Sequence, residues 1–149
     1  MDTKKLFIKT QTNLINWAIV VSLILSSLTL LSLFKTTYTF NSIASATLYT
    51  LISALLIRVR LKLEVKAALS ALVLFAVQFA FYLVTFFSGL PKMIALLKNV
   101  AETSSSYFIV IFSTLIGYGF FILCGYLYYK VYKAVQLINV LNAEESSIA

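Results

Sequence analysis

The sequence contains no histidine and a single cysteine, Cys124, among its 149 residues. Without histidine the chain has no imidazole to ligate haem or zinc, and it lacks the commonest general base. One thiol cannot close a disulfide within the chain, and it cannot supply a cysteine cluster for zinc or iron–sulfur. We therefore expect no catalytic residues, no metal site and no cofactor, structural lipids excepted, and we expect that the protein is not an enzyme.

Charged residues are scarce as well, at 11% of the chain, whereas a typical soluble domain has about 25%. All five acidic residues lie outside the long apolar runs, so transport coupled to an intramembrane carboxylate is not expected. The charge-free runs each exceed the roughly 20 residues that cross a bilayer core as a helix. They are residues 10–34, 36–57, 67–91 and 103–129.

These runs predict an all-α integral membrane protein with a single domain, residues 1–149, in which four transmembrane helices form an antiparallel bundle. Continuous apolar runs favour helices over a β-barrel, whose strands would alternate. The spans are predicted at about residues 14–34, 41–58, 67–88 and 106–130. Two amphipathic helices complete the prediction: a short one at 91–102, with a polar loop as the alternative, and a C-terminal one beyond the fourth span.

The basic residues predict the topology. Nine of them fall on one side of the predicted bundle and three, Lys35, Lys92 and Lys98, fall on the other. The positive-inside rule therefore places both termini and the second connection in the cytoplasm, or in the equivalent matrix or stroma. A bacterial inner membrane, an organellar inner membrane and an endomembrane all fit this bias, so the compartment stays open. Nucleic acid is not an expected partner, because the charges come in short pieces rather than on a basic domain.

The second connection, "RVRLKLEVK" at residues 58–66, alternates charged and apolar residues. Alone it would predict a β-strand, but between two spans it predicts a short, positively charged turn. Arg60 and Glu64 could pair at i, i+4 if the helix persists. We expect the turn and the end of the fourth span to dock anionic lipid or an acidic partner surface. The candidate docking residues are Arg58, Arg60, Lys62, Lys66, Lys130 and Lys133.

Weakly polar and small residues inside the spans predict helix-packing seams, because they allow close approach and hydrogen bonds between helices. Gln78 is the most polar of them at mid-depth. An interhelical hydrogen bond is the favoured interpretation for Gln78, and contact with lipid or a cofactor is the alternative. The candidate seam residues are Ser22, Ser26, Thr29, Gln78, Ser113 and Gly117. Four tyrosines near the end of the fourth span, Tyr126, Tyr128, Tyr129 and Tyr132, predict an aromatic belt at the inner interface.

The first three spans have no glycine or proline in their interiors, which suits a scaffold better than a pump with broken helices. We therefore predict a non-catalytic, small multi-pass membrane protein that is an accessory or structural subunit of a larger complex, or a tetraspan scaffold. Its expected partners are membrane lipids, other membrane subunits or further copies of itself.

Two short segments carry a resemblance. "FNSIASA" at residues 40–46 and "SGLP" at residues 88–91 are similar to the connections of GtrA-like four-span proteins. That family's Asn-Arg ending of the second span is replaced here by "IRVR" at residues 57–60. The resemblance implies an alternative function, a carrier of lipid-linked substrates that works as a homo-oligomer. The four-span layout with cytoplasmic tails also resembles MARVEL-type membrane-organising proteins.

Overall fold

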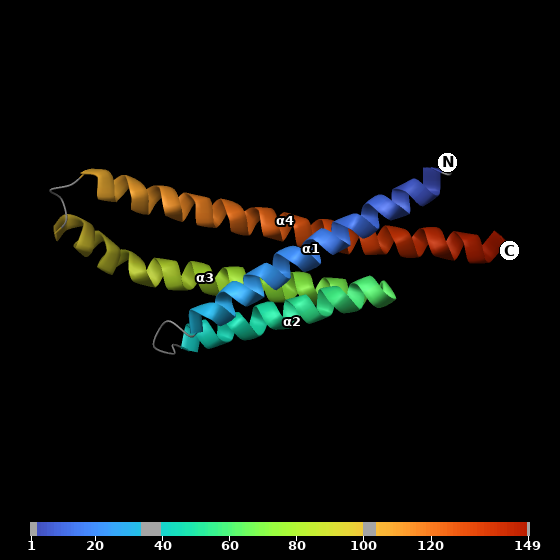
Figure 1. Cartoon of the computed structure of the whole chain (residues 1–149), viewed down its shortest axis with the longest axis horizontal. Coiled ribbons are helices and arrows are strands. Elements are labelled where there is room, and N and C mark those ends of the chain that lie inside the picture. The colour runs from blue at the N-terminus through green and yellow to red at the C-terminus, as the bar shows by residue number, and fades with distance from the viewer. Residues whose placement is uncertain (1–2, 34–39, 100–103, 149) are drawn as a thin grey trace.

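The computed structural model describes the backbone of residues 3–33, 40–99 and 104–148, and the side chains of residues 6–31, 42–91, 94–95, 112 and 114–144. All regular structure within these ranges is helical. The helices are α1 (Thr3–Leu33), α2 (Phe40–Lys62), α3 (Val65–Asn99) and α4 (Ser104–Ile148) (Figure 1).

Each of the four helices is long and apolar enough to cross a membrane. The stretches that meet these criteria are Leu6–Leu31, Ser42–Lys62, Val65–Pro91 and Thr114–Glu144. The prediction of an all-helical chain with four helices of membrane-spanning length is therefore confirmed, and a multi-pass membrane protein is the class that fits it.

The helices pack in a closed ring. α1 lies against α2 and α4, and α3 lies against the same two helices. The start of α1 and the end of α4 lie at the same end of the molecule as the turn between α2 and α3 (Figure 1). The end of α1 and the start of α4 lie at the opposite end (Figure 1). With 35 residues in α3 and 23 in α2, lengths of about 52 Å and 34 Å, α3 extends well past the α1–α2 hairpin.

The turn between α2 and α3 consists of only two residues, Leu63 and Glu64. Leu63 has a φ of 51°, in the left-handed region that ends a right-handed helix. Its amide still donates to the carbonyl of Val59 (2.8 Å), and α3 begins with a bond from Ala68 to the carbonyl of Glu64 (3.1 Å). Residues 58–66 therefore form a helix, a turn and a second helix, and the β-strand alternative is wrong.

Two predicted helix boundaries differ from the structure. α3 continues through Pro91 to Asn99, although the sequence predicted the end of the span near residue 88 and a separate helix at 91–102. Pro91 removes one backbone hydrogen bond, yet the helix is continuous across it. α4 is likewise one continuous helix of 45 residues, which joins the fourth span to the predicted C-terminal helix. Residues 100–102 lie outside the described part of the chain.

The packed core lies in the half of the bundle near the α2–α3 turn. It includes the apolar face of the C-terminal part of α4, where Val131, Val135 and Ile138 are buried. The sequence predicted an amphipathic C-terminal helix here, and the chain itself covers the apolar face of that helix. All four helices contribute to the core through Ile15, Ala18, Ile52, Leu56, Val59, Ala67, Ala71, Phe75, Tyr128, Val131 and Val135.

Candidate functional site

Three parts of the chain that are distant in sequence are joined at the α2–α3 turn. Arg60 Nε on α2 donates to Asn16 Oδ1 on α1 (2.9 Å). Asn139 Nδ2 on α4 donates to the carbonyl of Leu63 in the turn itself (2.9 Å). These two bonds connect the region of the turn to both of the helices that do not form it.

Glu64 pairs with Arg58 and not with Arg60. Arg58 Nε and Nη2 donate to the two carboxylate oxygens at 2.8 Å and 3.2 Å, a bidentate arrangement. The predicted Arg60–Glu64 pair is wrong because the left-handed Leu63 ends the helix before Glu64, so i, i+4 neighbours no longer share a face.

The remaining candidate docking residues lie around this turn at two levels. Lys62 and Lys66 flank it and are exposed. Lys133 and Lys130 lie on α4 about 6 and 9 residues before Asn139, which is roughly 9 Å and 14 Å along the helix from the level of the turn. Lys133 is exposed, and the Lys130 ammonium lies 5.3 Å from the centre of the Tyr126 ring.

The predicted aromatic belt divides into two groups. Tyr126 and Tyr129 are exposed, as residues of a belt would be. Tyr128 is only 1% exposed and meets Phe75 edge to face, with ring centres 4.8 Å apart. Tyr132 is half-buried and its hydroxyl accepts a bond from Gln136 Nε2 (2.7 Å). The helical phase could have separated Tyr128, because it shares a face with Cys124, Val131 and Val135.

The structure places the candidate seam residues of α1 between helices. The hydroxyls of Ser26 on α1 and Thr50 on α2 form a hydrogen bond of 3.1 Å between the two helices. Ser22 is fully buried and donates to the carbonyl of Ile19 (3.0 Å), while Thr29 donates to backbone carbonyls of its own helix. Gly117 lies beneath Tyr82 on α3, whose hydroxyl is 3.7 Å from the position of a Cβ atom built there. Ser113 is part of α4, and its side chain lies outside the described set.

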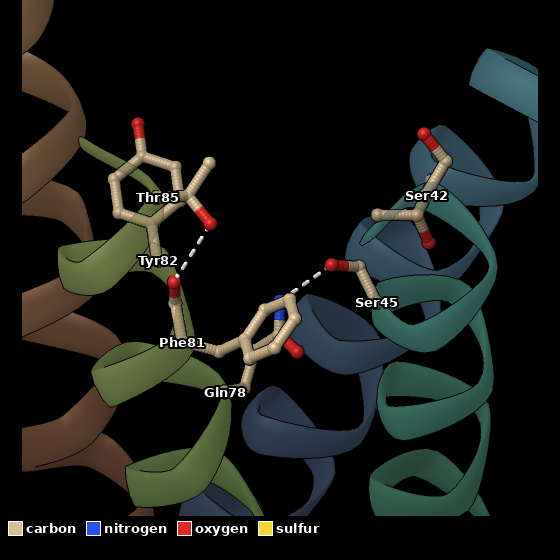
Figure 2. Close-up of a pocket in the computed structure, with 7 residues that line it drawn as sticks. Ser42, Ser45, Gln78, Phe81, Tyr82 and Thr85 are labelled. Carbon is tan, nitrogen blue, oxygen red and sulfur yellow. Dashed lines mark hydrogen bonds between the residues drawn. The ribbon is translucent and has the colours of Figure 1, made fainter. Parts of the chain in front are cut away.

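Gln78 joins α3 to α2 at the wall of a cavity. Its Nε2 donates to Ser45 Oγ (2.9 Å), and the residue is 3% exposed. Figure 2 shows the two side chains meeting across the gap between the helices, with Tyr82 and Thr85 on the following turns of α3. The cavity has a volume of about 260 Å³ and is lined by Thr29, Ser42, Ser45, Gln78, Phe81, Tyr82 and Thr85.

A second cavity of about 290 Å³ adjoins the first and shares Thr29, Ser45, Gln78 and Tyr82 with it. Its other walls are mostly apolar: Leu25, Leu28, Tyr49 and Phe121. All the described residues that line the two cavities are uncharged, and their polar groups are hydroxyls and one amide. Such a lining can hold a neutral hydrogen-bonding group, and it offers no strong acid, base or nucleophile.

Seams of aromatic rings close the side of the cavities formed by α3 and α4. Tyr82 contacts Phe121 (ring centres 4.7 Å apart) and Tyr118 (5.6 Å). The sequence indicated Gln78 and Tyr82 as polar residues of the third span, but it gave no signal for Ser45 or Tyr118, whose placement depends on how the helices rotate against one another. Within the described ranges, no three Cys, Asp or Glu side chains gather in a way that could hold a metal ion.

Comparisons of the chain with models of known protein families, with curated proteins and with solved structures find no match. Function is therefore inferred from the chain's own geometry.

Proposed function

We propose that the protein is a non-catalytic, multi-pass membrane protein that acts as an accessory or scaffold subunit of a larger membrane complex. The observation that supports this proposal best is the basic end of the bundle around the α2–α3 turn. There the α2–α3 turn is tied to α1 through Asn16 and to α4 through Asn139. The partner would be a membrane subunit with an acidic surface at the same level.

Rigidity and charge both favour docking at this end. A surface that is already cross-linked by hydrogen bonds between helices loses less conformational freedom when a partner binds. Lys62, Lys66 and Lys133 are exposed around it, and complementary charge speeds encounter and fixes orientation. The positive-inside rule assigns this end to the cytoplasm or its equivalent, where acidic partner surfaces and anionic lipids are both within reach.

The test removes charge without touching the contacts that hold the turn. Lys62→Gln with Lys66→Gln leaves Arg58, Arg60 and Asn139 in place. After extraction of the full chain from its native membrane in a mild detergent, we expect wild type to migrate on a native gel as part of a larger assembly. The double variant should lose much of that assembly, and mass spectrometry of the wild-type band would identify the partner.

A charge-matched control is available on the same helix as Lys66. Lys92→Gln with Lys98→Gln removes the same charge toward the far end of α3, and it should leave the assembly intact. Migration of the wild-type chain as an isolated monomer would count against the subunit role. An assembly that the two double variants weaken equally would show that net charge matters and the basic end does not.

A carrier of lipid-linked substrates, as in GtrA-like proteins, is the second candidate. The observation that favours it is the pair of cavities around Gln78, which a scaffold does not require. The chain reconstituted into proteoliposomes should then move a lipid-linked substrate between leaflets, and Gln78→Ala should reduce that flux. Absence of flux in the wild-type chain would exclude this function while leaving the subunit role intact.

A further inference from the structure

Two buried polar atoms beside the paired cavities have no hydrogen-bond partner among the described residues. They are the amide oxygen of Gln78 and the hydroxyl of Tyr118. The hydrocarbon chains of lipids cannot satisfy either atom, so each one left alone inside a membrane is costly. Turning the Gln78 amide over would let its oxygen accept from Ser45 and would leave the nitrogen without a partner instead. One end of this amide therefore remains for another molecule in either orientation.

The depth of Gln78 limits what that molecule can be. Gln78 lies at the middle of the candidate span Val65–Pro91, about 20 Å along α3 from the α2–α3 turn. From there the cavity extends to Thr85, toward the end of the bundle that faces away from the turn. A phosphate or ammonium group at this depth would be desolvated, and the described lining residues provide no opposite charge for it. The polar group that fits is a neutral one.

The hydrogen-bond donors and acceptors in the cavity wall further restrict the polar group that can bind there. In the orientation that the structure shows, Nε2 donates to Ser45 and the free end of the Gln78 amide is its oxygen, which can only accept a hydrogen bond. The Ser45 hydroxyl accepts from Gln78, so it keeps its own hydrogen to donate. A hydroxyl group on the ligand can satisfy both side chains, because it can donate to the Gln78 oxygen and accept from the Ser45 hydroxyl. An ester carbonyl can only accept. Phe81, Tyr82 and Phe121 supply aromatic walls for the hydrocarbon next to that hydroxyl.

We propose that the paired cavities around Gln78 bind a neutral lipid whose polar head is a hydroxyl group. Each cavity is several times the roughly 30 Å³ that one water occupies, so the head and the first carbons of the lipid fit inside. A sterol and a diacylglycerol share this chemistry. This site is independent of the subunit role, because docking at the basic end uses none of the residues that line the cavities.

The experiment uses the full chain in nanodiscs of phosphatidylcholine, with photoreactive analogues of a sterol and of a diacylglycerol as the two probes. We expect saturable labelling of peptides that contain residues 42–49 and 78–85. The matching unlabelled lipid should compete, and phosphatidylglycerol should not. Gln78→Leu removes the amide at similar volume and should weaken labelling roughly 5-fold, the effect of one lost hydrogen bond.

Gln136→Leu is the matched control, since it makes the same substitution on α4 at a residue bonded to Tyr132 and distant from the cavities along the chain. It should label as wild type does. If Gln78→Leu does not yield folded protein, Ser45→Ala removes the other polar group and should weaken labelling in the same way. Saturation by one probe alone identifies that lipid class as the ligand. Labelling that does not saturate, that spreads evenly over the helices, that phosphatidylglycerol displaces, or that is equal in the two glutamine variants overturns the proposal.

Discussion

Three glycines of α4 differ in what surrounds them, so replacing each one by alanine should have a different effect on stability. A Cβ atom built at Gly119 meets no described atom within 4 Å. At Gly117 it would lie 3.7 Å from the Tyr82 hydroxyl, an ordinary contact. At Gly125 it would lie 3.3 Å from Cε1 of Phe75, closer than most carbon contacts in proteins. Replacement of each glycine by alanine therefore tests how tightly α3 and α4 pack at each level.

The expected changes in the free energy of unfolding differ in sign between these variants. Alanine favours a helix interior over glycine by up to about 1 kcal/mol, and Gly119→Ala should gain most of this. At Gly125 the Phe75 ring must move, but Tyr128 and Phe121 hold it at ring separations of 4.8 Å and 6.1 Å. Overpacking in such a core costs about 1–3 kcal/mol. We therefore expect Gly125→Ala to destabilise the bundle by about 1 kcal/mol, and the two variants to differ by about 2 kcal/mol.

The free energy of unfolding can be measured by titration with SDS in mixed micelles, followed by helical circular dichroism. Trp17 would be a weak fluorescent reporter, since 66% of it is already exposed in the folded chain. Gly117→Ala should keep most of the helix gain and serves as the intermediate case. If Gly125→Ala proves as stable as Gly119→Ala, the α3–α4 seam is looser than described and the reasoning is refuted.

Three further predictions concern buried and exposed polar groups. Tyr128→Phe removes a buried hydroxyl that has no partner among the described residues, so it should be neutral or stabilising by up to about 1 kcal/mol in the same SDS titration. Tyr132→Phe removes the hydroxyl that accepts from Gln136 and should destabilise the chain slightly. A double-mutant cycle of Ser26→Ala and Thr50→Val should give a coupling energy of about 0.6–1.7 kcal/mol, and zero coupling would contradict the seam. Glu64→Gln breaks a partly exposed ion pair, so its cost should stay below about 1 kcal/mol and shrink in high salt.

The four helices were predictable because charge inside a bilayer is so costly that charge-free runs mark the spans. The helix ends were less predictable. α3 passes through Pro91, because a proline in the sequence marks a possible helix end without fixing one. The left-handed conformation of Leu63 was not predictable either, since leucine has no preference for it. It sets the pairing of Glu64 with Arg58, which sequence spacing alone assigned to Arg60.

The candidate site was likewise predictable only in part. Gln78 stands out in the sequence because an amide at mid-depth needs a partner. Ser45 as that partner, and Tyr82 beside it, follow from the rotation of α2 and α3, which one sequence does not encode in any short motif. Tyr128 was assigned to the interface because four tyrosines cluster in the sequence. Its burial depends on the face of α4 that turns toward Phe75.

The bond between Asn139 and Leu63 spans 76 residues and has a consequence for biosynthesis. When the first three helices leave the ribosome, the carbonyl at the α2–α3 turn and the inner faces of Ile15 and Ala71 have not yet met their partners. The same buried core includes Tyr128, Val131 and Val135 of α4, which are synthesised after the first three helices. A nascent chain of three helices therefore presents an unfinished interior to the insertion machinery and to quality-control proteases, and arrival of α4 ends that exposure.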